Sequence, residues 1–125
     1  MLSRQEIFDK VLDELRTQGS ACVDMNRVCR YRDWTGNKCA VGHLIPDGLY
    51  DKNIEGTSVN MPENFPSLLH TVLQNAGIDI WRDWKLLQRL QFAHDQCLTD
   101  SISAWEFRMR RIADDFELVF KEPAK

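Results

Sequence analysis

Long apolar runs are missing from this sequence. No stretch approaches the roughly 20 consecutive apolar residues that a membrane-spanning helix needs, and the first residues lack the apolar centre of an export signal. Glycine is also scarce, with six residues in 125, and no repeat or low-complexity segment is visible. We therefore expect a folded protein of the cytoplasm, without a membrane partner.

An excess of positive charge is missing as well. The net charge is -3, which argues against a protein that holds duplex nucleic acid mainly through phosphate contacts. Hydrophobic residues make up 43% of the chain, enough for a core that needs no metal or disulfide to support it. We expect residues 1–125 to form one domain.

Closely spaced cysteine pairs are absent. The four cysteines contain no C-x-x-C pair, so a zinc ribbon is not indicated, and no cofactor-binding motif occurs elsewhere. Without an export signal we expect reduced thiols. Cys29 and Cys39 flank a predicted turn, which leaves a disulfide between them as the alternative.

Apolar residues at helical spacing predict four main helices. Ser3 and Glu6 form a capping box at the start of the first, Gly77 stops the second, and Asp79 or Asp83 caps the third. The predicted ranges are about 4–18, 66–76, 84–98 and 103–120. The expected fold is mainly α, a small bundle of about four helices with a short β-hairpin or elbow near residues 28–45.

The elbow is the one chemically mixed segment among these helices. Residues 30–34 alternate as a short strand does, and residues 35–37 favour a turn. Asn37 can then cap a short helix over 38–45, which Pro46 stops. Cys39 would lie in its first turn, where free amide donors favour a thiolate. Residues 47–64 follow as a long loop, read equally well as a functional loop or as a surface excursion.

A cysteine nucleophile is the catalytic hypothesis for this segment. Cys39 would attack, His94 would act as base, and Asp95, Asp47 or Gln91 would orient the histidine, as in a cysteine-dependent hydrolase or transferase. The competing interpretation is a buried thiol that packs as a small hydrophobic group.

A metal centre is a further alternative. Cys29, Cys39, His43 and His94 have the atom types of a tetrahedral zinc site, but their spacing matches no known pattern. We therefore assign no metal ligand and no cofactor.

Basic and aromatic residues gather at the elbow of this otherwise acidic protein, which favours a contact surface for a partner protein or a small nucleotide. The alternative is a strand edge that charges protect from pairing. A nucleotide-sequestering protein would hold its ligand between subunits through Arg30, Arg32 and Tyr31. Trp81, Trp84 and Trp105 are expected in the core or at a homodimer interface. The predicted contact residues are Arg27, Arg30, Tyr31, Arg32, Trp34, Lys38, Asp47 and Tyr50.

Several motifs occur along the chain: Cys29-x-Tyr31, Gly36 to Gly42, Leu44 to Asp47, Tyr50, Glu55-Gly56, Leu90-Gln91, His94-Asp95 and Trp105. This pattern spans most of the chain and resembles a group of small proteins encoded in bacteriophages and prophages. The resemblance implies a bacterial host cytoplasm and carries no catalytic assignment. Small phage proteins of this size often bind a host protein or counter a host defence system. His43 departs from the pattern, which weakens it as a ligand.

These observations favour a non-enzymatic accessory protein that binds and modulates a host macromolecule, most simply a protein, through the elbow and loop at residues 27–64. The cysteine-dependent enzyme and the nucleotide-sequestering protein remain its alternatives.

Overall fold

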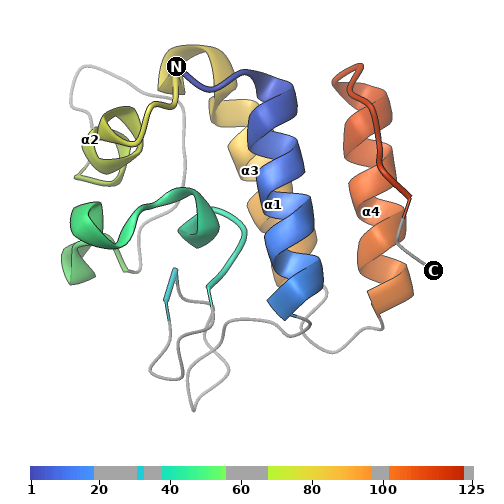
Figure 1. Cartoon of the computed structure of the whole chain (residues 1–125), viewed down its shortest axis with the longest axis horizontal. Coiled ribbons are helices and arrows are strands. Elements are labelled where there is room, and N and C mark those ends of the chain that lie inside the picture. The colour runs from blue at the N-terminus through green and yellow to red at the C-terminus, as the bar shows by residue number, and fades with distance from the viewer. Residues whose placement is uncertain (19–30, 33–37, 56–67, 97–101, 123–125) are drawn as a thin grey trace.

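The computed structural model describes residues 1–18, 31–32, 38–55, 68–96 and 102–122, and this part of the chain is mainly α-helical (Figure 1). The predicted mainly-α fold is confirmed. The described residues form no β-strand. They form four α-helices and three 3₁₀ turns: α1 (Arg4–Gln18), η1 (Gly42–Leu44), η2 (Asp47–Leu49), η3 (Lys52–Ile54), α2 (Leu68–Asn75), α3 (Ile80–Gln96) and α4 (Ile102–Asp115).

The helices α1, α3 and α4 lie side by side, and α2 and the 3₁₀ turns pack beside them (Figure 1). Helices α1 and α3 run in the same direction, whereas α4 runs back along them. Because α1 also contacts η1, it joins the helical layer to the elbow. No helix in the described ranges has the length and apolar character needed to cross a membrane.

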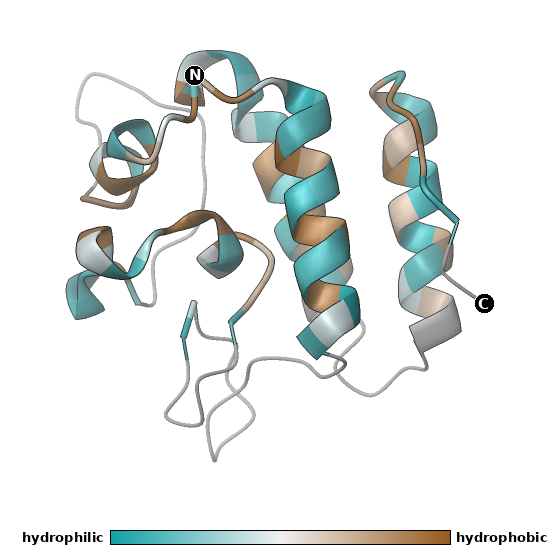
Figure 2. Ribbon diagram, in the orientation of Figure 1, coloured by the Kyte–Doolittle hydropathy of each residue, from teal (hydrophilic) through white to brown (hydrophobic). Residues whose placement is uncertain are grey.

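Helix α1 has the predicted bounds and the predicted cap. The backbone N–H of Glu6 donates to Ser3 Oγ at 3.1 Å, and the Ser3 N–H donates to Glu6 Oε1 at 2.9 Å. Figure 2 shows brown and teal residues alternating along α1, as expected of a helix with one buried stripe. The residues of that stripe are Ile7, Phe8, Val11, Leu12 and Leu15.

Helix α3 begins at Ile80, and of its two predicted caps Asp79 is the one observed. The Arg82 N–H donates to Asp79 Oδ1 at 3.2 Å. Asp83 in the first turn is fully buried and forms ion pairs with Arg4 at 2.8 Å and with Arg82 at 2.6 Å. Pairing with two guanidinium groups makes a buried carboxylate tolerable and ties the start of α3 to the start of α1.

Helices α2 and α4 end in the same way. Gly77 follows α2 with a φ of 92°, as its predicted role as a stop requires, and Ile78 N–H donates back to Leu73 O at 3.1 Å. After α4, Glu117 takes a φ of 57° and Leu118 N–H donates to Ala113 O at 2.7 Å. The helix therefore ends at Asp115, and its predicted continuation to Phe120 is wrong.

The residues after α4 turn back along the bundle (Figure 1). The Gln5 side chain forms two hydrogen bonds with the backbone of Val119, at 2.8 and 2.9 Å. The ring of Phe120 contacts two guanidinium groups. Its centre is 4.5 Å from the Cζ of Arg110 and 5.3 Å from the Cζ of Arg16. The segment is thus fixed against both α1 and α4.

The elbow is held by one antiparallel bridge between Arg32 and Lys38, with Cys39 N–H donating to Tyr31 O at 3.3 Å. The turn residues 33–37 lie outside the described residues. A helix over 38–45 does not form. The segment instead contains the short turn η1, and Cys39 precedes it in irregular backbone.

Gly42 permits the closest approach in the elbow. A Cβ atom at this position would overlap the carbonyl oxygen of Tyr31, whereas a Cβ at Gly48 would meet no atom within 4 Å. The overlap is with backbone, which cannot swing aside as a long side chain can. Gly42 therefore lets the 31–32 segment lie directly on η1.

We predict that Gly42→Ala lowers the free energy of unfolding by about 2 kcal/mol, the typical cost of forcing an extra methyl group into a packed site. The matched variant Gly48→Ala is expected to stay within about 0.5 kcal/mol of wild type. Urea denaturation followed by circular dichroism measures both. Equal stabilities of the two variants would contradict the close packing at Gly42.

Candidate functional site: the elbow and its polar clamp

The carboxylate of Glu55 is the centre of the elbow. It accepts hydrogen bonds from the backbone N–H groups of Tyr31 at 2.8 Å and Arg32 at 3.1 Å, and from the Tyr50 hydroxyl at 2.6 Å. Hydrogen bonds to a charged acceptor are stronger than those between neutral groups. Glu55 thus joins residues 31–32 to the end of η3. We call these three contacts the Glu55 clamp.

Arg32 fills the space between the clamp and η2. Its guanidinium lies 4.5 Å from the centre of the Tyr50 ring, and its Nη2 donates to Ile45 O at 2.8 Å. Its Nη1 pairs with Asp47 Oδ1 at 2.8 Å. The side chain is 17% exposed, so Arg32 is chiefly part of the elbow's own packing.

Lys38 is the second cation near Asp47. Its Nζ is 3.7 Å from the same Oδ1 that Arg32 contacts. Its backbone is fixed by Gln18, whose amide both donates to Lys38 O and accepts from Lys38 N–H, each at 2.8 Å. Asp47 itself is 84% exposed.

The predicted contact residues fall into three groups. Tyr31 is buried, so the expectation that it lies exposed is wrong: the Gly42 contact and the Glu55 clamp draw it into the core. Arg32, Lys38, Asp47 and Tyr50 are brought together as one cluster. Arg27, Arg30 and Trp34 lie outside the described residues.

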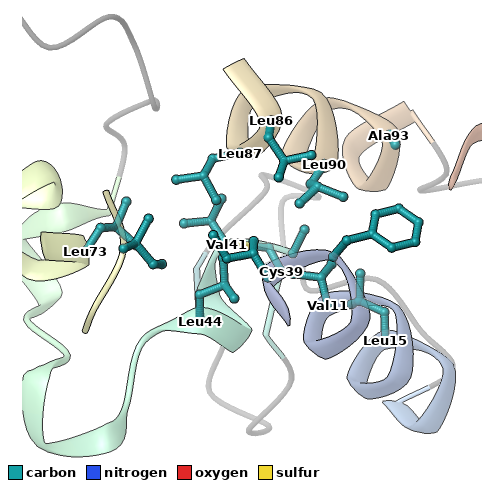
Figure 3. Packing of buried hydrophobic residues seen from close by; sticks show 14 of the residues in the cluster. Val11, Leu15, Cys39, Val41, Leu44, Leu73, Leu86, Leu87, Leu90 and Ala93 are labelled. Carbon is teal, nitrogen blue, oxygen red and sulfur yellow. The ribbon is translucent and has the colours of Figure 1, made fainter. Parts of the chain in front are cut away.

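The structure gives no support to Cys39 as a nucleophile. Its side chain is fully buried, and Figure 3 shows it inside the hydrophobic cluster that also contains Val11, Val41 and Leu90. Its sulfur accepts a hydrogen bond from Gly42 N–H at 3.3 Å. A substrate cannot reach a thiol in this position.

Two of the predicted partners of Cys39, His94 and Gln91, are held in the interior or by backbone, whereas Asp47 is exposed and pairs with Arg32. His94 is buried near the end of α3, and the side chain of Asp95 lies outside the described part. Gln91 Oε1 accepts the Val41 N–H at 3.1 Å, which joins α3 to the elbow. Gln91 therefore serves the packing of the elbow.

His43 forms a polar contact across the elbow that the sequence does not predict. Its Nδ1 lies 2.7 Å from Glu14 Oε2 of α1, and its side chain is 8% exposed. Burial lowers the pKa of His43 below the usual value, and the charges of Lys38 and His94 act in the same direction, while Glu14 opposes them. At neutral pH the imidazole is therefore neutral and donates Nδ1–H to the carboxylate.

His43 Nε2 is buried and makes no hydrogen bond. Within the described ranges, no three His, Cys, Asp or Glu side chains are placed to hold a metal ion. Cys29, a member of the hypothetical zinc site, lies outside those ranges.

Glu55 and Glu14 are the site residues that sequence reasoning missed. Glu55 contacts backbone 23 and 24 residues earlier, and Glu14 contacts His43 29 residues later. Such distant pairings leave no periodic signal. Among the predicted interface aromatics, Trp105 is buried, Trp84 is partly buried and Trp81 is exposed.

We predict that His43 makes the fold less stable as the pH falls below about 6.5, the ordinary pKa of histidine. The unfolded chain then takes up a proton that the folded state resists, because the folded pKa is lowered, so the free energy of unfolding decreases until the folded pKa is passed. Above this range His43 is neutral in both states and contributes no pH dependence.

Urea denaturation of wild type and His43→Asn between pH 7.5 and 5 measures this effect, since asparagine keeps a donor for Glu14 but does not titrate. Glu14 does not blur the comparison: burial raises its pKa, but Lys10 and His43 outweigh that effect and leave it lowered, so it titrates below this range. We expect the variant to lose less stability than wild type on acidification. A difference between the two proteins that is the same at every pH would refute the role of His43.

Comparisons of the chain with protein-family models, with curated proteins and with solved structures gave no match.

Proposed function

We propose that this chain is a non-enzymatic accessory protein of phage or prophage origin that binds and modulates a host protein through the elbow. The contact surface consists of the outward side of η2 and η3 with the cluster around Asp47. Its exposed members are Pro46, Asp47, Gly48, Lys52 and Asn53.

One observation supports this proposal. The elbow has almost no regular structure, yet its inner face is anchored in the core and its solvent-facing side carries polar groups. Four apolar side chains reach the core, and the Glu55 clamp fixes the polar groups between them. The anchoring residues are Val41, Leu44, Ile45 and Ile54. A surface that is already ordered loses little conformational entropy when a partner docks, which favours binding.

The burial of Cys39 favours a binding protein over a cysteine-dependent enzyme. A cysteine-dependent hydrolase or transferase needs a thiol that its substrate can reach, and this one is fully buried. The nucleotide-sequestering alternative loses Tyr31 as a stacking platform for the same reason. Within the described part of the elbow, the Tyr50 ring is already stacked against the Arg32 guanidinium.

The phage context and the host partner come from the resemblance of residues 29–56 and of parts of α3 and α4 to small phage proteins. In that setting the protein would work in the cytoplasm of the bacterial host and redirect a host protein or counter a defence system. The net charge of -3 favours a protein partner over duplex nucleic acid.

We predict that Gly48→Trp abolishes capture of the host partner. A Cβ at Gly48 meets no atom within 4 Å, so the fold accommodates the large side chain while the surface is blocked. The matched control is Val119→Trp, a neutral change at an exposed residue that follows α4. Affinity capture from bacterial lysate with tagged protein, followed by mass spectrometry, makes the comparison.

Melting temperatures of the two variants should match that of wild type. Partners retained by Val119→Trp and lost by Gly48→Trp are the expected result. Identical sets of captured proteins for both variants and wild type would overturn the elbow as the contact surface.

A further inference from the structure

Asp47 stands outside the two cations that it pairs with. Its carboxylate is 84% exposed, whereas the side chains of Arg32 and Lys38 are 17% and 28% exposed. One oxygen atom, Oδ1, lies 2.8 Å from Arg32 Nη1 and 3.7 Å from Lys38 Nζ. The two positive groups thus lie on the buried side of this cluster, and the carboxylate of Asp47 lies on the side that faces solvent.

The Arg32 guanidinium and the Lys38 backbone are positioned by contacts that do not involve Asp47. Arg32 is held by the Tyr50 ring and by the carbonyl oxygen of Ile45. The Lys38 backbone is held by the paired hydrogen bonds with Gln18 and by the bridge to Arg32. Removal of the Asp47 carboxylate would therefore leave the guanidinium and the Lys38 backbone in place.

Glu55 does not take the place of Asp47. Its two oxygens already accept hydrogen bonds from Tyr31 N–H, Arg32 N–H and the Tyr50 hydroxyl. Its charge is directed at the backbone of the elbow, on the inner side of the cluster. A carboxylate from outside would thus meet the guanidinium and the ammonium with Asp47 as its competitor.

We propose that Arg32 and Lys38 form an anion-binding site which Asp47 occupies in the free protein and an acidic side chain of the partner protein occupies in the complex. This inference rests on the proposed function, since it names the chemistry that the elbow recognises. An exposed ion pair is weak, so the exchange costs little, whereas a carboxylate buried in an interface gains from the lower dielectric around it.

Arginine suits this role because its Nη1 can donate a charge-assisted hydrogen bond to a carboxylate while Nη2 stays on Ile45 O. The stacked and hydrogen-bonded guanidinium has already lost most of its freedom, so a partner does not need to order it. Asp47 also acts as a selectivity device: its charge repels an acidic group that approaches without the right geometry.

The test is an NMR titration of the whole ¹⁵N-labelled chain with hexaglutamate, using hexaglutamine and inorganic phosphate as comparison ligands. The variant Asp47→Asn removes the charge and keeps the shape. The control variant Asp114→Asn makes the same charge change at an exposed residue of α4. Both positions are exposed, so both variants are expected to fold as wild type does.

We expect Asp47→Asn to bind hexaglutamate about two to five times more tightly than wild type, the factor that corresponds to loss of one exposed ion pair. Asp114→Asn should change the affinity less, hexaglutamine should not bind, and adding Lys38→Gln to Asp47→Asn should reverse the gain. Chemical shifts should move in residues 38–55.

An equal gain from Asp47→Asn and Asp114→Asn, or no gain from either, would overturn the exchange. Binding of inorganic phosphate as tight as that of hexaglutamate would overturn the assignment to an acidic protein segment. Failure here is distinguishable from failure of the proposed function, because Gly48→Trp blocks the elbow whether or not Asp47 is displaced.

Discussion

The contact between Gly42 and the carbonyl group of Tyr31 is the constraint on which the elbow depends. Only a residue without a side chain allows the two backbones to lie this close. The contact lays Tyr31 against η1, where its side chain is buried. The Glu55 clamp and the Arg32 contacts with Tyr50 and Asp47 then tie the same segment to η2 and η3. An irregular segment thereby gains the fixed geometry that a binding surface needs.

Glutamine side chains provide a second recurring means of holding irregular backbone. Gln18 pairs twice with the backbone of Lys38, Gln5 pairs twice with Val119, and Gln91 accepts the amide of Val41. Each amide replaces the backbone partner that a neighbouring strand would supply. Helices α1 and α3 thus satisfy segments that have no regular structure of their own, and the site is positioned by the helical scaffold.

Local signals predicted much of the fold, and distant contacts explain what they missed. The capping box and the apolar stripe fixed α1, since both act within a few residues, and Gly77 marked the end of α2. The apolar pattern continued to Phe120, but the left-handed turn at Glu117 ended α4 first. Glu55 holds the backbone of Tyr31 and Arg32 without any local signal, because these two partners lie more than twenty residues away. A basic-aromatic pattern also cannot tell an exposed tyrosine from a buried one, as Tyr31 illustrates.

The central claim is that the elbow is part of the core below and a contact surface above, and the reactivity of Cys39 tests it most directly. Its thiol is fully buried beside α1, and its sulfur accepts a hydrogen bond from Gly42 N–H. Labelling with a thiol reagent at neutral pH, read by peptide mapping, should modify Cys39 on the order of a thousandfold more slowly in the folded protein than in urea. Labelling of Cys39 in the folded protein at the rate of the unfolded chain would contradict the account.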